Sequence, residues 1–321
     1  MTRRPGLDPR LEAVARAHGG VFSSALITGL DVDEHDLVAW RRSGAVRRVR
    51  RDAYVLGSAW AEADASGRLA LRARAVIAAR GFREIASHQS ALALHGLPVL
   101  GVPTDTVDVV AEVTKVRLAN GLRSHPPVPG LDVVVLAGYR AAAIAPAVVQ
   151  VTARSGLLAG LVPLDRALHD GRCDVAGIDR EVDRLPAGSR ARRRAAALLD
   201  AADPRAESVG ETRTRLLLRD LGYRPLSQVT LVDRFGVALG RVDFLIGERL
   251  VVEFDGAVKY AGAEGRRALA AEKAREDALR AEGYVVVRVT WGDLDHPERV
   301  ARMIRRAEAQ LLRRDGVVAA S

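Results

Sequence analysis

Acidic residues recur within an apolar stretch in the last third of the chain, at Asp243, Glu253 and Asp255. The valine, leucine and phenylalanine residues around them predict a buried element, where acidic side chains rarely lack a role. Magnesium prefers oxygen ligands and needs only one or two carboxylates, because it keeps several of its waters. These residue types therefore indicate a Mg²⁺ (or Mn²⁺) site with Asp243, Glu253 and Asp255 as candidate ligands.

The spacing of the acidic residues predicts how they come together. Two β-rich runs, 241–246 and 250–254, flank Gly247-Glu248-Arg249, a pattern typical of a hairpin. With Glu248 at the centre of the turn, Asp243 and Glu253 face each other with Cβ atoms about 4.5–5.5 Å apart. Asp255 lies two residues beyond Glu253 and therefore on the same face. Carboxylates this close cannot all ionise freely, so the arrangement is costly unless a cation or protons relieve the repulsion. The alternative interpretation is a solvated acidic turn whose acids pair with arginines.

The elements around the hairpin have a simple order. The patterns predict a helix over 210–221, a strand over 226–232, the hairpin, a helix over 264–282, a strand over 284–290 and a final helix over 297–313. This is an α-β-β-β-α-β core. Glu211 lies on the first of these helices.

Several motifs in this region carry a family resemblance. They are "GETRTR" with Glu211, "RVDF" with Asp243, "VVEFDGAVKY" with Glu253, Asp255 and Lys259, and then "AEKAREDALRAEGY" and "VVVRVTWGDL". In this order they resemble the PD-(D/E)XK nuclease-like domain family of unknown function that is related to the very-short-patch-repair endonucleases. The resemblance covers roughly the last third of the chain. It implies a restriction-endonuclease-like fold and a magnesium-dependent nuclease whose catalytic residues are Glu211, Asp243, Glu253, Asp255 and Lys259.

The sequence departs from that family at one position. Where the superfamily has Glu-x-Lys, this chain has Glu253-x-Asp255, so an acid occupies the lysine position. Either Asp255 is an additional ligand and Lys259 or Lys273 takes the role of the lysine, or catalysis is lost and only the fold persists. Lysine is rare in this arginine-rich chain, and an ammonium positions water and meets a developing oxyanion differently from a guanidinium. This favours Lys259 as the replacement.

The N-terminal residues 1–57 predict a winged helix-turn-helix. Three helices, over 11–17, 25–28 and 33–44, precede two β-like runs, 45–51 and 53–56. The run "GGVFSSALITGLDVDEHDLVAWRRSGAVRRVRRDAYVL" resembles the N-terminal domain of the abortive-infection type IV antitoxin family, which implies a DNA-binding module, often of a repressor. Because acidic residues lie at the start of the third helix, phosphate contacts are expected from Arg41, Arg42, Arg47, Arg48, Arg50 and Arg51. A winged helix used for protein contacts is the alternative.

Residues 65–203 predict a mixed α/β middle domain. A helix over 67–80, strands over 106–113 and 131–137, and two or three helices over 144–185 precede a basic helix and a polar hinge near Pro204. The motif "ASHQSALALHGLPV" resembles the middle region of the same antitoxin-like proteins. His88 and His95, seven residues apart, share a helical face, but without a third ligand nearby they are expected to be packing residues and not a metal site. The third expected domain spans 205–315.

Composition sets the context for these domains. The net charge of +9 favours a polyanionic partner such as nucleic acid, although an arginine-rich coding bias would have the same effect. The single cysteine, Cys173, cannot form an internal disulfide and fits a reducing cytosol. The absence of a long apolar run and of a signal-peptide segment predicts a cytoplasmic protein without a membrane partner.

Two functions follow from these expectations. The first is a DNA-binding protein with a magnesium-dependent endonuclease domain. The second is an antitoxin-like transcriptional regulator whose nuclease-like domain is inactive, with a cognate toxin or another protein as a possible partner. A protein-interaction scaffold is a third interpretation.

Overall fold

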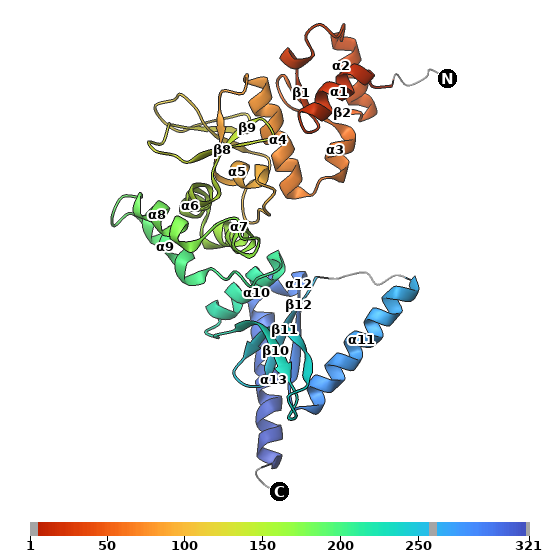
Figure 1. Ribbon diagram of the computed structural model, residues 1–321, viewed down its shortest axis with the longest axis vertical. Coiled ribbons are helices and arrows are strands. Elements are labelled where there is room, and N and C mark those ends of the chain that lie inside the picture. Colours follow the sequence, from red (N-terminus) through yellow and green to blue (C-terminus); the bar gives the residue numbers. More distant parts are fainter. Residues whose placement is uncertain (1–5, 257–261, 319–321) are drawn as a thin grey trace. The chain divides into compact units, whose positions relative to one another are not determined.

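The computed structural model describes residues 6–256 and 262–318, with side chains described at 6–256 and 272–313. Its architecture confirms the expected α+β class, with helices and three separate sheets. The chain forms two compact units, Met1–Ala202 and Asp203–Ser321 (Figure 1). The division lies next to the polar hinge expected near Pro204. The first unit holds both the expected winged helix and the expected middle domain.

The described N-terminal part of the first unit contains four helical segments and a three-stranded sheet in the order β1-β3-β2. Its elements are α1 (Pro9–Ala17), β1 (Val21–Ser23), the 3₁₀ helix η1 (Ala25–Ile27), α2 (Glu34–Ser43), β2 (Val46–Arg50), β3 (Ala53–Leu56) and α3 (Gly57–Glu62). The acids at the start of α2 have a structural role. Asp33 caps the helix by accepting the N–H of Asp36, and the Asp36 side chain accepts the N–H of Asp33 in return. Strand β1 was not expected from the sequence.

A six-stranded sheet forms the centre of the rest of the first unit, in the order β6-β7-β5-β4-β9-β8. Its strands are β4 (Ile85–Ala86), β5 (Val107–Val110), β6 (Arg117–Ala119), β7 (Leu122–His125), β8 (Val133–Leu136) and β9 (Tyr139–Ala142). The expectation of only two strands here was wrong. A hairpin, β6–β7, lies between the two predicted strands, and its polar, partly exposed residues lack the apolar pattern on which that prediction relied.

Helices α4 (Ala65–Ala79) and α5 (His88–Leu94) pack against this sheet, and the helices that follow its last strand pack mainly against one another. These later helices are α6 (Ile144–Ser155), α7 (Leu157–His169), α8 (Val175–Asp183) and α9 (Arg190–Ala201). Helix α5 is short and fully packed, since all its residues after His88 are buried. It begins directly after β4, so the chain turns sharply from strand to helix at Ser87 and His88.

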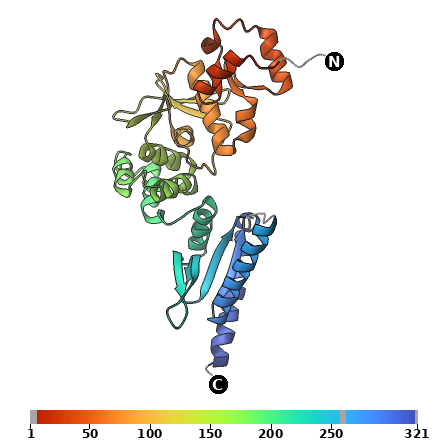
Figure 2. The ribbon, with the colours of Figure 1, turned by 45° about the vertical axis from the view of Figure 1, so that its right-hand side comes forward.

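The second unit has the expected element order. It contains α10 (Val209–Asp220), β10 (Leu226–Val232), β11 (Ala238–Ile246), β12 (Leu250–Asp255), α11 (Gly262–Ala281), β13 (Val285–Thr290), α12 (Trp291–Leu294) and α13 (Pro297–Val318). The sheet order is β10-β11-β12-β13, with β12 and β13 parallel. The β11–β12 register pairs Phe244 with Val252 and Ile246 with Leu250, so the hairpin is centred on Glu248. The β10–β11 turn projects from the sheet (Figure 2).

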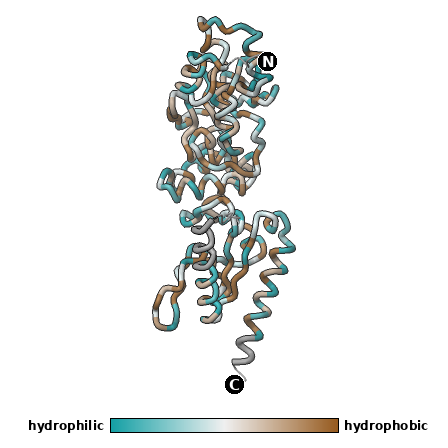
Figure 3. The backbone as a smooth tube through the Cα atoms, turned by 90° about the vertical axis from the view of Figure 1, so that its right-hand side faces the viewer, coloured by the Kyte–Doolittle hydropathy of each residue, from teal (hydrophilic) through white to brown (hydrophobic). Residues whose placement is uncertain are grey.

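The sheet of the second unit buries both faces, which is why its strands are hydrophobic in the hydropathy view (Figure 3). Phe244, Val252 and Val287 pack with α10 and α13 on one face. Leu245 and Val251 pack with Leu279 of α11 on the other. Strand alternation places Asp243, Glu253 and Asp255 on this second face, beside α11. Nowhere in the described segments is a helix long and apolar enough to cross a membrane.

Candidate functional site

Asp243 is the centre of the acidic site. The backbone N–H of Phe254, on the neighbouring strand, donates to its Oδ2 atom at 2.8 Å. Burial raises the pKa of Asp243 to about 6, and the nearby Glu211 and Glu253 carboxylates add to the rise, whereas the Phe254 N–H and Arg275 oppose it. Asp243 therefore takes up a proton at about pH 6, and a cation at this position would relieve the same electrostatic cost.

Glu211 lies in the first turn of α10 and is buried. Its Oε2 atom accepts hydrogen bonds from the side-chain amide of Gln228 (2.8 Å) and from the backbone N–H of Glu207 (3.0 Å). The preceding Gly210 lets the helix approach Phe254, because a Cβ atom at Gly210 would lie 2.0 Å from the ring. This close packing of α10 on β12 brings Glu211 to the end of the hairpin that carries Asp243.

Glu253 has charged partners. Arg275 of α11 approaches its Oε1 atom at 2.9 Å, and Arg288 of β13 lies 3.8 Å from Oε2. Arg288 also pairs with Glu272 (2.8 Å) and Glu276 (2.7 Å), so acids and guanidiniums alternate along this face. A metal ion at Glu253 would have to displace Arg275 or share the carboxylate with it.

The other acidic-site residues lie further out. Asp255 is exposed at the end of β12. Lys259 lies outside the described residues, and Lys273 is exposed on α11. The ligand atoms of Asp243, Glu253 and Asp255 do not all lie within 4.8 Å of one another. In the described part of the chain, His88, Asp108 and His125 meet this spacing.

The raised pKa of Asp243 predicts that metal binding depends on pH. We expect the affinity for Mg²⁺ or Mn²⁺ to rise by about tenfold per pH unit up to about pH 6 and then to level off, because the ion displaces one proton below that pH. Calorimetric titrations between pH 5 and pH 8 measure this. Equal affinity at pH 5 and pH 7 would show that Asp243 is not a ligand.

The arginines expected to contact DNA gather around two hollows of the first unit. Arg41, Arg42, Arg47 and Arg48 line a pocket of 560 Å³, together with Trp60 and no acidic residue. The guanidinium of Arg47 stacks 4.7 Å from the centre of the Trp60 ring. Like charges gathered without a carboxylate favour an anionic ligand.

Arg50 and Arg51 line the second hollow, of 570 Å³, beside Arg48 and Arg80. Arg50 donates to the backbone carbonyls of Ala119 (3.5 Å) and Asn120 (3.4 Å) in the β6–β7 turn. Burial lowers the pKa of Arg50. Arg50 thus links the β2–β3 hairpin to the six-stranded sheet. Arg51 is exposed and pairs with its neighbour Asp52 at 3.5 Å.

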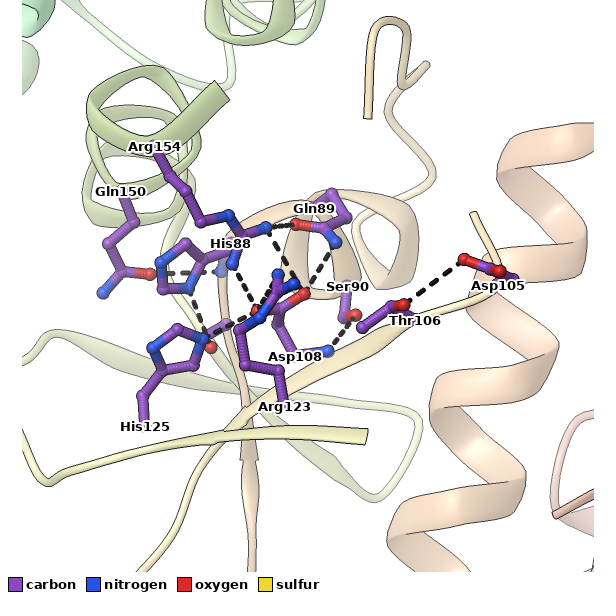
Figure 4. Close-up of polar contacts among 11 residues, drawn as sticks. His88, Gln89, Ser90, Asp105, Thr106, Asp108, Arg123, His125, Gln150 and Arg154 are labelled. Atoms are coloured by element: carbon purple, nitrogen blue, oxygen red, sulfur yellow. Dashed lines mark hydrogen bonds and ion pairs between the residues drawn. The ribbon is translucent and has the colours of Figure 1, made fainter. Parts of the chain in front are cut away.

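A polar cluster that sequence reasoning missed lies at the start of α5 (Figure 4). Its centre is the fully buried carboxylate of Asp108 on β5. His125 Nε2 lies 2.7 Å from Asp108 Oδ1, and the Gln89 amide donates to Oδ2 at 2.6 Å. Arg154 of α6 also pairs with this carboxylate, and Arg123 of β7 lies 3.4 Å from it. His125 and Arg154 lower the pKa of Asp108 to about 2 against the opposing effect of burial.

His88, Asp108 and His125 could hold a metal ion, because one ligand atom of each lies within 4.8 Å of the others. The Nε2 atom of His95 hydrogen-bonds the carbonyl of Ala142 at 2.9 Å, whereas the prediction that His88 has no further ligands nearby was wrong. His88 differs, since its neighbours come from strands distant in sequence. The signal available was the alternation of Arg123 and His125 on one strand face.

No protein-family model matches the chain, and the curated proteins include no match to it. The resemblances to a nuclease-like and to an antitoxin-like family therefore rest on the motifs and on the arrangement of their residues.

Proposed function

We propose that the second unit is a magnesium-dependent DNA phosphodiesterase, an endonuclease-like domain that the arginines of the first unit bring to DNA. One observation carries this proposal. Asp243 and Glu253 come together at the end of a buried hairpin, and the buried Glu211 acts on Asp243 from α10. Three acids on separate elements around one half-buried position form a site that a hard divalent cation would neutralise.

Each residue would have a distinct task at this site. Asp243 and Glu253 supply oxygen ligands for Mg²⁺ or Mn²⁺, and Glu211 accepts hydrogen bonds from waters around the ion. When bound, the ion supplies charge neutralisation at the phosphate and a more acidic water. Arg275, now paired with Glu253 at 2.9 Å, would be able to offer its guanidinium to a phosphate oxygen if Glu253 held the ion.

A plasmid-nicking assay tests this function. Supercoiled plasmid is incubated with the full chain and Mg²⁺, Mn²⁺ or a chelator. We expect nicked circles with either metal and none with the chelator. Equal nicking with the chelator, or none under any condition, would rule out metal-dependent cleavage.

A DNA-binding regulator with an inactive nuclease-like domain is the second candidate function. The ion pair between Arg275 and Glu253, at 2.9 Å, favours it, because a ligand already neutralised by arginine attracts a cation less. The acid at position 255, where the related nucleases have lysine, favours it as well. A chain that binds DNA but neither nicks plasmid nor melts at a higher temperature with metal would support this candidate.

DNA binding through the expected arginines gives a testable salt dependence. Reversing the charge of Arg47, Arg48, Arg50 and Arg51 should flatten the log–log salt dependence of duplex affinity by up to about 3.6, because each phosphate contact contributes about 0.9. Fluorescence anisotropy with a labelled duplex in graded salt measures the slope. Charge reversal of the exposed Arg140 and Arg180 serves as the matched control. An unchanged slope in the first variant would remove these arginines from the interface.

A further inference from the structure

The cluster around Asp108 carries more positive than negative charge. Two guanidiniums, from Arg123 and Arg154, face a single carboxylate, and the imidazoles of His88 and His125 complete the group. These side chains come from α5, β5, β7 and α6, so four separate elements converge on one place (Figure 4). A partly buried surplus of positive charge is costly unless an anion neutralises it.

Several donors of this cluster are not used within the protein. In the described part of the chain, Arg123 makes one long contact, at 3.4 Å, through one terminal nitrogen. Gln150 uses its carbonyl oxygen to accept the N–H of His88 at 3.1 Å, and its amide nitrogen donates to no described group. The Nδ1 atom of His88 contacts the hydroxyl of Ser87 at 3.1 Å, and no described group hydrogen-bonds Nε2, which carries the ring proton in the tautomer whose Nδ1 accepts from that hydroxyl. Side chains on α5, β7 and α6 therefore have nitrogen atoms that no described group of the protein hydrogen-bonds.

The geometry disfavours a cation here. The rings of His88 and His125 are stacked, with centroids 4.1 Å apart and planes at 20°. Ring nitrogens act in the plane of their rings, so stacked rings direct them side by side and not toward one ion. A divalent cation at this place would lie beside two guanidiniums and one carboxylate, and the guanidiniums would repel it. Two oxygens of one oxyanion, in contrast, can accept from parallel donors.

We infer that this cluster binds a phosphate group, with Arg123, His88 and Gln150 as donors and Asp108 as the internal counter-ion that holds the two guanidiniums in place. The charge balance fits, because one guanidinium in excess matches the single charge of a phosphodiester. The side chains of Arg123 and Arg154 are 20% and 26% exposed, so both retain contact with solvent. This site belongs to the first unit and does not depend on nuclease activity.

The backbone conformation of His88 supports the assignment of a binding site to this cluster. His88 has φ +49°, a left-handed conformation that is unfavourable for a histidine. The Gln150 side chain accepts its N–H and holds this conformation. Strain of this kind persists where the surrounding structure fixes it, and it clusters at binding sites.

Histidine NMR tests the inference on the full chain. Ring ¹H–¹³C resonances are followed during titration with inorganic phosphate, a nucleoside 5′-monophosphate, a short DNA duplex, and Zn²⁺ as the competing cation, at constant ionic strength and with chloride as the reference. We expect phosphate to shift the resonances of His88 and His125 and to leave those of His35 and His296, which are exposed, unchanged. Shifts with the monophosphates alone would identify a free phosphate ester as the ligand, and shifts with the duplex as well would identify the DNA backbone.

Substitutions provide the second measurement. Arg123→Gln should weaken phosphate binding by about tenfold or more, because a charge-assisted hydrogen bond is lost. Arg117→Gln, on the adjacent strand and exposed, is the matched control and should bind phosphate like the wild type. The inference is overturned if no phosphate source shifts His88 and His125, if Zn²⁺ shifts them and phosphate does not, or if both arginine variants weaken binding equally. The wild-type titration decides the first two outcomes even if Arg123→Gln does not fold.

Discussion

Asp243→Asn is expected to lower magnesium-dependent nicking by about 100-fold or more, since loss of a metal ligand removes about 3 kcal/mol of transition-state stabilisation. The amide keeps the size and one oxygen of the side chain but loses the negative charge that holds the ion. The metal-induced rise of the melting temperature should shrink in parallel, because that rise reports binding to the folded state. Gel quantification of nicked circles and thermal melting with and without metal measure the two effects.

The metal-free variant should be no less stable than the wild type at pH 8. In the wild type, the pKa of Asp243 is raised to about 6, above its value of about 3.9 in an unfolded chain. The stability that its protonated form contributes is complete below about pH 4 and is lost as the pH rises through about 6. Asparagine stays neutral and escapes this loss.

Glu248→Gln is the matched control for this substitution. It removes the same charge from the exposed turn of the same hairpin. It should leave nicking and the metal-induced melting shift within twofold of the wild type. If both variants nick at the wild-type rate, Asp243 is not a ligand and the proposed nuclease site is wrong.

The sequence predicted the second unit well because its signals are local. Apolar residues on both sides of Gly247 predicted the turn and the inner ends of the two strands, and the register follows from them, although β11 begins at Ala238, three residues before the expected start. The position of Asp243 next to Phe254 could therefore be anticipated. The pairing of Arg275 with Glu253 could not, because it depends on how α11 rotates about its axis when it packs on the sheet.

The cluster around Asp108 was missed for a related reason. Strands β5 and β7 pair in parallel, with Asp108 beside Arg123 and a hairpin strand between them in the sequence. No local periodicity in the sequence predicts such a parallel pairing of strands. The motif around His88 was visible, but its partners arrive from distant parts of the chain. For polar residues in a core, the residue types predict that they have a function, but only the fold shows which groups they contact.

Asp108→Asn should destabilise the first unit by about 3–5 kcal/mol, the usual cost of breaking a buried ion pair by removing one partner. The carboxylate is fully buried, and its loss leaves the guanidiniums of Arg154 and Arg123 without a counter-ion. Urea unfolding followed by the fluorescence of Trp40 and Trp60, in a Trp291→Phe background, isolates the first unit.

The pH dependence of this loss has a definite sign. The pKa of Asp108 is lowered to about 2, so its contribution is present above about pH 4 and is lost as the pH falls through about 2. The wild type should lose its advantage over Asp108→Asn in this acid range. Burial also lowers the pKa of His88 well below its usual value, so acidification below about pH 6.5 destabilises both proteins through that residue.

Two controls separate the ion pair from other effects of the Asp108 substitution. Asp105→Asn, in the exposed segment before β5, should change stability by less than about 0.5 kcal/mol. Adding Arg154→Met to Asp108→Asn should recover part of the loss, because it removes one of the two uncompensated charges. Phosphate should stabilise Asp108→Asn more than the wild type, since the anion then takes the place of the missing carboxylate. If Asp108→Asn is as stable as Asp105→Asn, the carboxylate is not the counter-ion that holds this cluster together.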